Sequence, residues 1–319
     1  MSRLISNSNF SITINFKNNL FSGMLLNIKQ ILSLFGELIK ARQTILLVYT
    51  GVLSYLISVA SLGQPINWFN LLHLAISLYL AVSGTTVLNM YIDRDIDAIM
   101  ERTKDRPLPS GKVTASTVLI TGTIFTAVGV FLAFLTLNWL SALIIFFGFF
   151  FDVVVYSMLL KRRTKYSIIF GGIAGGLPAW AGRVAITGSL DWIGFLFLIF
   201  ILTWIPVHIL TIALIPKNFE GYKKANIPMW PVVSSKAQTM RVIAIGAFLS
   251  SFALYEILQI LDANAIIRII WGACCVFLLI LSIKNLIKPS NKLTFLIFKI
   301  ASLYMLLGFL LVFIGVILQ

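Results

Sequence analysis

The sequence predicts an all-α polytopic membrane protein with nine transmembrane helices, and three observations support this fold class. First, 59% of the residues are hydrophobic and 11% are charged, with a mean hydropathy of +0.97, whereas soluble globular chains carry about 25% charged residues. Second, the chain contains nine apolar runs of roughly the 20 residues that cross a bilayer as a helix. Third, strongly basic connections alternate with weakly charged ones along the chain.

The N-terminal region precedes the first span and divides into two parts. Residues 1–24 form a polar tail rich in Asn and Ser, without the apolar core of a cleaved signal peptide. Residues 25–40, LLNIKQILSLFGELIK, form an amphipathic segment that we expect to lie at the membrane interface. We expect residues 25–319 to form a single transmembrane domain.

Each predicted span is an apolar run that ends at polar, charged or turn-forming residues. Because a helix of this composition hydrogen-bonds its own backbone, it is the structure that an apolar run adopts in lipid. The predicted spans cover residues 43–62, 68–91, 114–135, 138–160, 166–186, 192–215, 239–260, 264–284 and 293–318.

The distribution of basic residues predicts the orientation of these spans. Of the 25 Lys and Arg residues, all but Arg183 and Arg268 fall in the N-terminal region, in every second connection, or in the span ends that flank those connections. Because basic residues are retained on the cytoplasmic side, the N-terminus is predicted to be cytoplasmic and the C-terminus outside. The net charge of +14 therefore reflects topology and membrane lipid, and it does not indicate a nucleic-acid partner.

Acidic residues concentrate in one stretch at the cytoplasmic end of the second span. Five of the 11 acids lie in residues 89–111, NMYIDRDIDAIMERTKDRPLPSG. Asn89, Asp93 and Asp97 recur every fourth residue, which places them on one face of a helix. Two carboxylates and an amide suit Mg²⁺ bound to a substrate phosphate, and the interleaved basic residues suit phosphate oxygens.

Two other interpretations of this stretch remain open from spacing alone. It is consistent with a charged helix end that its own Arg and Lys residues neutralise. It is also consistent with a cation or proton path in a coupled transporter, because ionisable groups at membrane depth often serve that role. Against the transporter, the acids lie at the cytoplasmic end, and no matching pair of broken helices is evident.

Three stretches resemble the protohaem IX farnesyltransferase branch of the UbiA-type intramembrane prenyltransferases. The first is residues 89–111, which contain the pattern N-x-x-x-D-x-x-x-D followed by R-P-L-P-S-G. The second is residues 156–182, YSMLLKRRTKYSIIFGGIAGGLPAWAG, and the third is residues 225–233, ANIPMWPVV. The resemblance spans roughly residues 30–310 and implies the nine-helix fold of that family, in agreement with the spans above.

The resemblance implies transfer of farnesyl from farnesyl diphosphate to a vinyl group of protohaem IX, assisted by Mg²⁺. It implies that Asn89, Asp93, Asp97 and Glu220 bind the metal and assist departure of the diphosphate. The substrate contacts that it implies are Arg94, Arg102, Arg106, Lys161, Arg162, His208 and Tyr222. It further implies contact with haem A synthase or with the assembly of a terminal oxidase.

The chain departs from the family pattern at two places near the second acidic motif. In residues 217–224, KNFEGYKK, Glu220 is the only acid where relatives usually carry two. In residues 203–210, TWIPVHIL, Val207 separates Pro206 from His208, which are normally adjacent. These departures keep open a UbiA-type enzyme with another acceptor, such as an aromatic acid, a quinone precursor or a lipid.

The predicted location is an integral protein of a prokaryotic cell membrane with its active site on the cytoplasmic side. A mitochondrial inner membrane is the alternative, because the acid-free tail weakly resembles a transit segment.

Overall fold

The computed structural model describes residues 20–319, and the residues that it describes are helical, with turns and loops but no strand. Most of the predicted tail, residues 1–24, lies outside the described residues. Helix α1 spans Leu20–Leu38 and includes most of the predicted amphipathic segment. It belongs largely to a separate compact unit that ends at Gly36, whereas Glu37–Gln319 form the second unit. The interfacial position of α1 stays a prediction.

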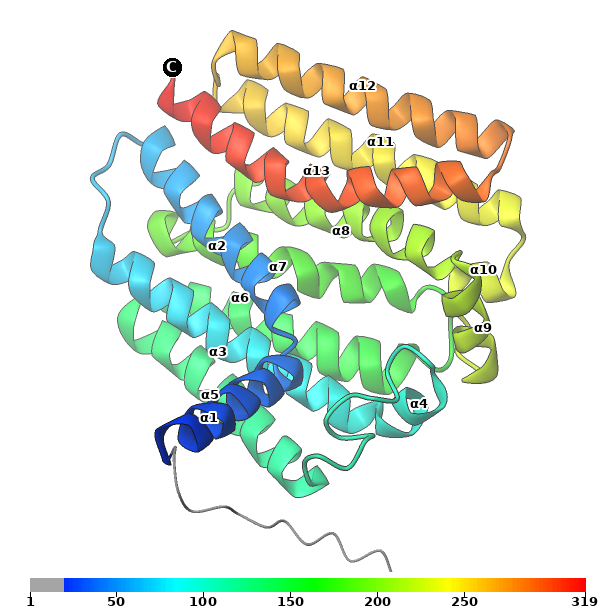
Figure 1. Ribbon diagram of the computed structural model, residues 1–319. Coiled ribbons are helices and arrows are strands. Elements are labelled where there is room, and N and C mark those ends of the chain that lie inside the picture. Colours follow the sequence, from blue (N-terminus) through cyan, green and yellow to red (C-terminus); the bar gives the residue numbers. More distant parts are fainter. Residues whose placement is uncertain (1–19) are drawn as a thin grey trace, which may run out of the picture. The chain divides into compact units, whose positions relative to one another are not determined.

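The second unit contains nine helices that are long and apolar enough to cross a membrane, which confirms the prediction for the described residues (Figure 1). They are α2 (Ala41–Ser61), α3 (Trp68–Ile92), α5 (Ala115–Thr136), α6 with η1 (Trp139–Phe149 and Phe150–Leu160), α7 (Ser167–Thr187), α8 (Trp192–Ala213), α11 (Lys236–Ile260), α12 (Ala265–Ile287) and α13 (Asn291–Ile317). Three short helices lie in the connections: α4 (Arg94–Ile99), α9 (Pro216–Lys224) and α10 (Trp230–Val233).

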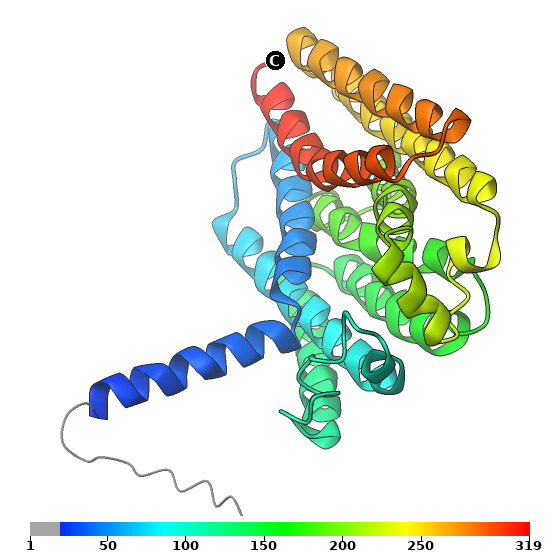
Figure 2. The same cartoon turned by 45° about the vertical axis from the view of Figure 1, so that its right-hand side comes forward.

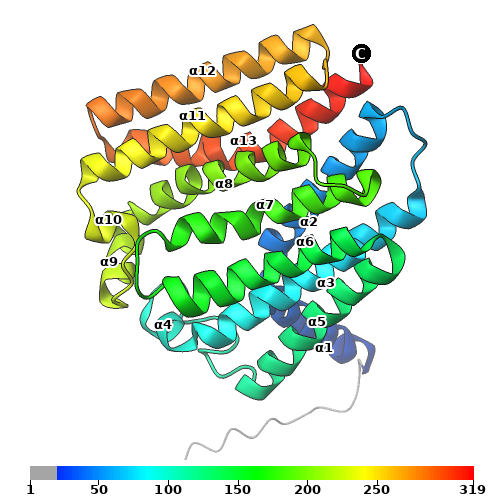
Figure 3. The ribbon, with the colours of Figure 1, turned by 180° about the vertical axis from the view of Figure 1, so that it is seen from behind.

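The short helices gather at one end of the bundle. Figures 1 and 3 show α4, α9 and α10 together at the end where α3 and α8 finish and α11 begins. Because successive spans run in opposite directions, every strongly basic connection lies at this end. The opposite end carries Trp68, Trp139 and Trp192, which begin three spans and are 70%, 63% and 60% exposed. Exposed Trp residues at helix ends are typical of the membrane–water interface.

Close helix contacts in the bundle depend on glycine. Gly182 of α7 faces Gly51 of α2, and a Cβ at Gly182 would lie 2.1 Å from the Gly51 carbonyl oxygen. A Cβ at Gly176 would lie 2.7 Å from the Leu198 oxygen of α8. Small residues at such crossings allow membrane helices to approach closely. The last three spans, α11–α13, run side by side next to α8 (Figure 2), and they share with it the larger apolar core.

The fourth span changes its backbone pattern halfway along its length. It begins as α-helix α6 and continues as π-helix η1, which the sequence did not predict. In a π-helix the backbone N–H bonds to the carbonyl five residues earlier, and such segments are frequent at functional sites. The η1 segment ends beside the acidic end of α3, where Lys161 meets Asp93.

Candidate active site

The acidic residues of the first motif lie on one side of a helical junction. Helix α3 ends at Ile92, Asp93 joins it to α4, and the backbone N–H groups of Asp93 and Asp97 bond to the carbonyls of Asn89 and Asp93. The four-residue helical register is therefore kept across the junction. Asp93 and Asp97 are 4% and 3% exposed, and Asn89 is buried with them.

Each carboxylate of this face is paired with a cation from a different segment. Lys161, which follows η1, donates to Asp93 Oδ2. Arg106, in the loop after α4, donates to Asp97 Oδ2 at 2.6 Å. The Thr103 hydroxyl donates to the Asp97 carbonyl at 3.0 Å, which folds this loop back over the acids. The structure thus brings together five of the predicted site residues: Asn89, Asp93, Asp97, Arg106 and Lys161.

One oxygen of this cluster has no partner. Oδ1 of Asp93 is buried and accepts no hydrogen bond from the residues that the structure describes. Buried polar atoms are normally hydrogen-bonded, so an unpartnered carboxylate oxygen marks a place where a cation belongs. Carboxylate and amide oxygens form the donor set that Mg²⁺ prefers. Asn89, Asp93 and Asp97 therefore fit a divalent metal.

Two lysines lie among the charged residues of the cluster, and their surroundings shift their pKa values in opposite directions. Burial acts to lower the pKa of Lys161, but its interactions with Tyr156, Asp93 and Asp97 raise that pKa above the ordinary value. Lys40, which immediately precedes α2, differs, because burial and repulsion from Arg106 and Lys161 lower its pKa to about 8. A buried, like-charged group of this kind is a site to which an anion binds favourably.

The remaining arginines of the prediction lie on the periphery. Arg94 is exposed and turns back to the Tyr91 carbonyl at 2.7 Å, with its guanidinium 4.6 Å from the Tyr91 ring centre. Arg162 is exposed and makes a two-pronged ion pair with Asp95, with both contacts at 2.7 Å. This interaction lowers the pKa of Asp95. Arg102 is exposed and forms no ion pair within residues 20–319.

The second motif lies on α9, beside Met100, the residue that follows α4. Tyr222 is buried in the same apolar cluster as Ile96 and Met100, and a Cβ on Gly221 would lie 3.3 Å from Met100 Cε. The Glu220 carboxylate is exposed and has no ion pair in the described chain. The structure therefore brings the two motifs to the same end of the bundle, but it does not place Glu220 among the buried acids.

His208 lies in an aromatic environment between α8 and α13. Its ring stacks on Trp204 at a centroid distance of 4.9 Å and lies 5.0 Å from the Phe298 ring. Its Nδ1 is 3.4 Å from the Ser302 hydroxyl. The hydrogen bond and ring contacts found for His208 are thus with α8 and α13, and they do not reach the acids of α3.

The described residues contain no group of three or more His, Cys, Asp or Glu side chains placed to bind a metal. The ligands expected from the sequence are Asn89, Asp93, Asp97 and Glu220. They do not form such a group, because Asn89 offers an amide and Glu220 is exposed. The carboxylates of Asp93 and Asp97 are instead each held by a cation.

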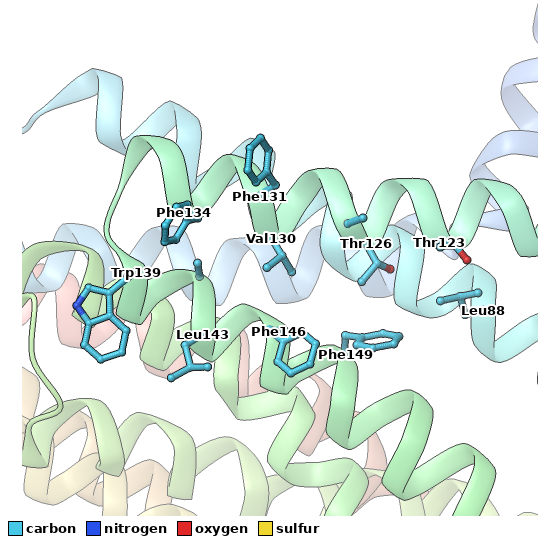
Figure 4. Close-up of a pocket in the computed structure, with 12 residues that line it drawn as sticks. Leu88, Thr123, Thr126, Val130, Phe131, Phe134, Trp139, Leu143, Phe146 and Phe149 are labelled. Carbon is cyan, nitrogen blue, oxygen red and sulfur yellow. The ribbon is translucent and has the colours of Figure 1, made fainter.

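A large apolar groove lies beside the site, between α5 and α6 (Figure 4). Its volume is about 650 Å³, and its lining includes Leu88 at one end and Trp139 at the other. Its lining residues are apolar except for Thr123, Thr126 and the Trp139 indole. The groove suits an apolar chain, and it has no charged group that would bind a diphosphate.

Three residues of the cluster were not predicted from the sequence. Asp152 of η1 accepts a hydrogen bond from Asn89 Nδ2, and Ser157 Oγ donates to Asn89 Oδ1, both at 2.8 Å. Lys40 interacts electrostatically with Arg106 and Lys161. The available signal for Asp152 was an isolated acid within the apolar run of residues 149–155, FFFDVVV. Ser157 and Lys40 lacked any comparable signal.

Comparison with known proteins points to one family. Residues 45–306 match the family model described as the UbiA prenyltransferase family. A protein named protoheme IX farnesyltransferase from Archaeoglobus fulgidus is 40% identical over 270 residues, which cover 84% of this chain and 92% of that protein. A protein of the same name from Caldivirga maquilingensis is 34% identical over 279 residues, covering 88% of this chain and 97% of that protein.

Solved structures share the fold at low sequence identity. A structure described as "Structural and mechanistic insights into the biosynthesis of Digeranylgeranylglyceryl phosphate synthase in membranes" has a TM-score of 0.75 at 20% identity, covering 90% of this chain and 99% of that chain. A UbiA homolog from Archaeoglobus fulgidus bound to GPP and Mg2+ has a TM-score of 0.62 at 15% identity, covering 88% of this chain and 99% of that chain.

Proposed function

Because the chain belongs to the UbiA prenyltransferase family, we propose that it transfers farnesyl from farnesyl diphosphate to a vinyl group of protohaem IX. Family membership makes the chain a prenyltransferase and an integral membrane protein. The substrate pair is supported by the relatives from Archaeoglobus fulgidus and Caldivirga maquilingensis, which carry the name protoheme IX farnesyltransferase. The observation that carries the proposal is the buried cluster of Asn89, Asp93 and Asp97, which offers metal-binding oxygens for the diphosphate.

Asn89, Asp93 and Asp97 are the proposed ligands of Mg²⁺, with Glu220 as an additional ligand from α9. The buried, unpartnered Oδ1 of Asp93 supports this assignment. A UbiA homolog from Archaeoglobus fulgidus is known with GPP and Mg2+ bound, which supports a divalent metal for the family. When bound, the metal would neutralise the charge that develops on the departing diphosphate.

Arg106 and Lys161 are the proposed inner contacts of the diphosphate. Both cations now pair with carboxylates, so metal binding to those carboxylates would free the guanidinium and ammonium groups for phosphate oxygens. Preorganised cations of this kind stabilise a leaving anion more strongly in a buried site than in water. Arg94, Arg102 and Arg162 are exposed, and we assign them the role of attracting the diphosphate to the entrance.

The acceptor is proposed to bind on the α8 and α9 side of the cluster. Tyr222 of α9 lies in the larger apolar core, and His208 lies among the aromatic rings of α8 and α13. Flat apolar rings are suitable surfaces for a porphyrin. The site would be cytoplasmic, in a prokaryotic cell membrane, with haem A synthase or a terminal oxidase assembly as the receiving partner.

Product analysis tests this proposal directly. The purified protein would be incubated with Mg²⁺, farnesyl diphosphate and protohaem, and the pigment would be examined by mass spectrometry. The expected product is a farnesylated haem, with pyrophosphate released in equal amount. Prenylation of an aromatic acid, a quinone precursor or a lipid, without any haem product, would establish a different acceptor. Absence of pyrophosphate release with every acceptor would contradict prenyl transfer and favour the cation-coupled transporter.

A further inference from the structure

Asp152 is an acid within a membrane span that the proposed reaction has not yet used. It lies on η1 between apolar neighbours, and ionisable residues within spans usually face the interior and serve a function. Its Oδ2 accepts a hydrogen bond from Asn89 Nδ2 at 2.8 Å. Lys40 and Lys161 both interact electrostatically with its carboxylate. Asp152 therefore faces the cluster of charged residues around Asp93.

The carboxamide of Asn89 is held at both ends. Asp152 holds the nitrogen, while Ser157 Oγ donates to Asn89 Oδ1 at 2.8 Å. An ionised carboxylate only accepts hydrogen bonds, so the amide must turn its NH₂ group toward Asp152 and its oxygen away. The amide oxygen has two lone pairs, and the hydrogen bond from Ser157 uses one of them. One lone pair of a fixed oxygen therefore stays available.

The π-helical backbone of η1 makes this two-sided grip possible. Asp152 and Ser157 are five residues apart, which would separate them by about 140° around an α-helix. In a π-helix, residues five apart are joined by the backbone hydrogen bond and approach the same face. The bond from Lys161 N to the Tyr156 carbonyl, at 2.7 Å, continues this pattern to the end of the segment. The altered helix thus directs Asp152, Ser157 and Lys161 toward α3.

We propose that Asp152 is a positioning residue of the metal–diphosphate site, which fixes the carboxamide of Asn89 so that its oxygen faces the metal position. This inference rests on the proposed function, because it assigns Asn89 as a ligand. Residues that orient a metal ligand typically contribute about 10- to 100-fold to metal affinity. Ser157 completes the grip from the oxygen side, and its removal should have a smaller effect because the Asp152 contact remains.

A titration of the full-length protein in detergent with Mn²⁺ tests the inference without turnover. Electron paramagnetic resonance measures the free Mn²⁺ and so gives the dissociation constant. Asp152→Ala should raise the dissociation constant for Mn²⁺ by about 10-fold or more. Asp152→Asn keeps an oxygen that accepts from Asn89, so its constant should stay within about threefold of the wild type. Ser157→Ala should lie between the two. Met158→Ala is the matched control, because this η1 side chain is exposed, and it should match the wild type.

The outcomes separate this inference from the proposed function. Wild-type Mn²⁺ affinity in Asp152→Ala would overturn the positioning role and leave the metal site intact. Equal loss in Asp152→Asn and Asp152→Ala would also overturn it, because charge and not orientation would then be decisive. If Asp152→Ala does not fold, Asp152→Asn and Ser157→Ala are compared instead, and Ser157→Ala should have the larger dissociation constant. Wild-type Mn²⁺ affinity in both Ser157→Ala and Met158→Ala would contradict the proposal that Asn89 is held from both sides. Unchanged Mn²⁺ binding in Asp93→Asn would refute the metal site itself.

Discussion

At the scale of single residues, the site is a set of buried carboxylates balanced by cations that come from elsewhere in the chain. Asp93 pairs with Lys161, which is distant in sequence, and Asp97 pairs with Arg106, which lies in the loop after α4. Burying such pairs is costly unless their geometry is good. Their retention in an apolar protein is explained if the carboxylates serve a metal and the cations serve an anion.

Replacing either carboxylate should abolish most of the activity. We expect Asp93→Asn and Asp97→Asn each to slow pyrophosphate release by about 10²–10³-fold, because the amide removes a metal-binding charge and leaves a cation unpaired. Expression and the number of spans should not change. Asp105→Asn is the control, because Asp105 is exposed and should retain nearly full activity. Full activity in both Asp93→Asn and Asp97→Asn would refute the assignment.

Lys40 should make the binding of farnesyl diphosphate weaker at alkaline pH. Its pKa is lowered to about 8, so it carries a positive charge below that pH and loses the charge as the pH rises through it. The Michaelis constant for farnesyl diphosphate should therefore rise above about pH 8. Lys40→Arg keeps its charge throughout this range and should remove that rise. Identical pH profiles for the wild type and Lys40→Arg would exclude Lys40 from the diphosphate site.

The sequence predicted part of this site and missed part of it for identifiable reasons. The four-residue spacing of Asn89, Asp93 and Asp97 was sufficient to place them on one face, because a helical register is a local property. The grip of Asp152 on Asn89 depends on a π-helix, and the sequence carries no comparable local signal for one. The exposed position of Glu220 depends on how α9 packs on the rest of the bundle, which is a tertiary property.

At the scale of elements, glycine contacts determine how closely the helices approach. The crossing of α2 and α7 brings Gly51 and Gly182 together with no room for a side chain. Gly172, Gly175 and Gly176 of α7 lie against α8, where an added Cβ would come within 2.8, 2.6 and 2.7 Å of atoms of Leu202, Ile205 and Leu198.

Gly182→Ala should destabilise the bundle. The added Cβ would lie 2.1 Å from the Gly51 carbonyl oxygen, so the two helices must separate, at a cost of about 1–3 kcal/mol. A lower melting temperature in detergent would show this. Gly148→Ala is the matched control, because nothing lies within 4 Å of its added Cβ, and alanine favours a helix over glycine. Equal melting temperatures for the two variants would contradict the role of the crossing.

At the scale of the whole molecule, the proposed site lies at the end of the bundle that carries the strongly basic connections between the nine spans of the described chain. The connections that hold α4, α9 and α10 are strongly basic and lie at one end of the bundle (Figure 1), and the exposed Trp residues begin spans at the other end. An allylic substrate is itself partly apolar and is made reactive when its diphosphate leaves. An active site at the membrane surface with an apolar interior behind it suits both parts of such a molecule.

Labelling of single cysteines should establish this orientation. In a background without Cys274 and Cys275, Lys288→Cys reports the connection between α12 and α13, and Ser189→Cys reports the connection between α7 and α8; both positions are exposed. A membrane-impermeant maleimide should label Ser189→Cys in intact cells and Lys288→Cys only after permeabilisation. The reverse pattern would contradict a cytoplasmic active site.

The most direct test of the site is an experimental structure with Mn²⁺ and an unreactive farnesyl thiolodiphosphate. We predict anomalous density for the metal between Asn89, Asp93 and Asp97, with Lys161 and Arg106 turned from these carboxylates to the diphosphate oxygens. Metal and diphosphate bound elsewhere, with the Lys161–Asp93 and Arg106–Asp97 pairs unchanged, would contradict the proposed site.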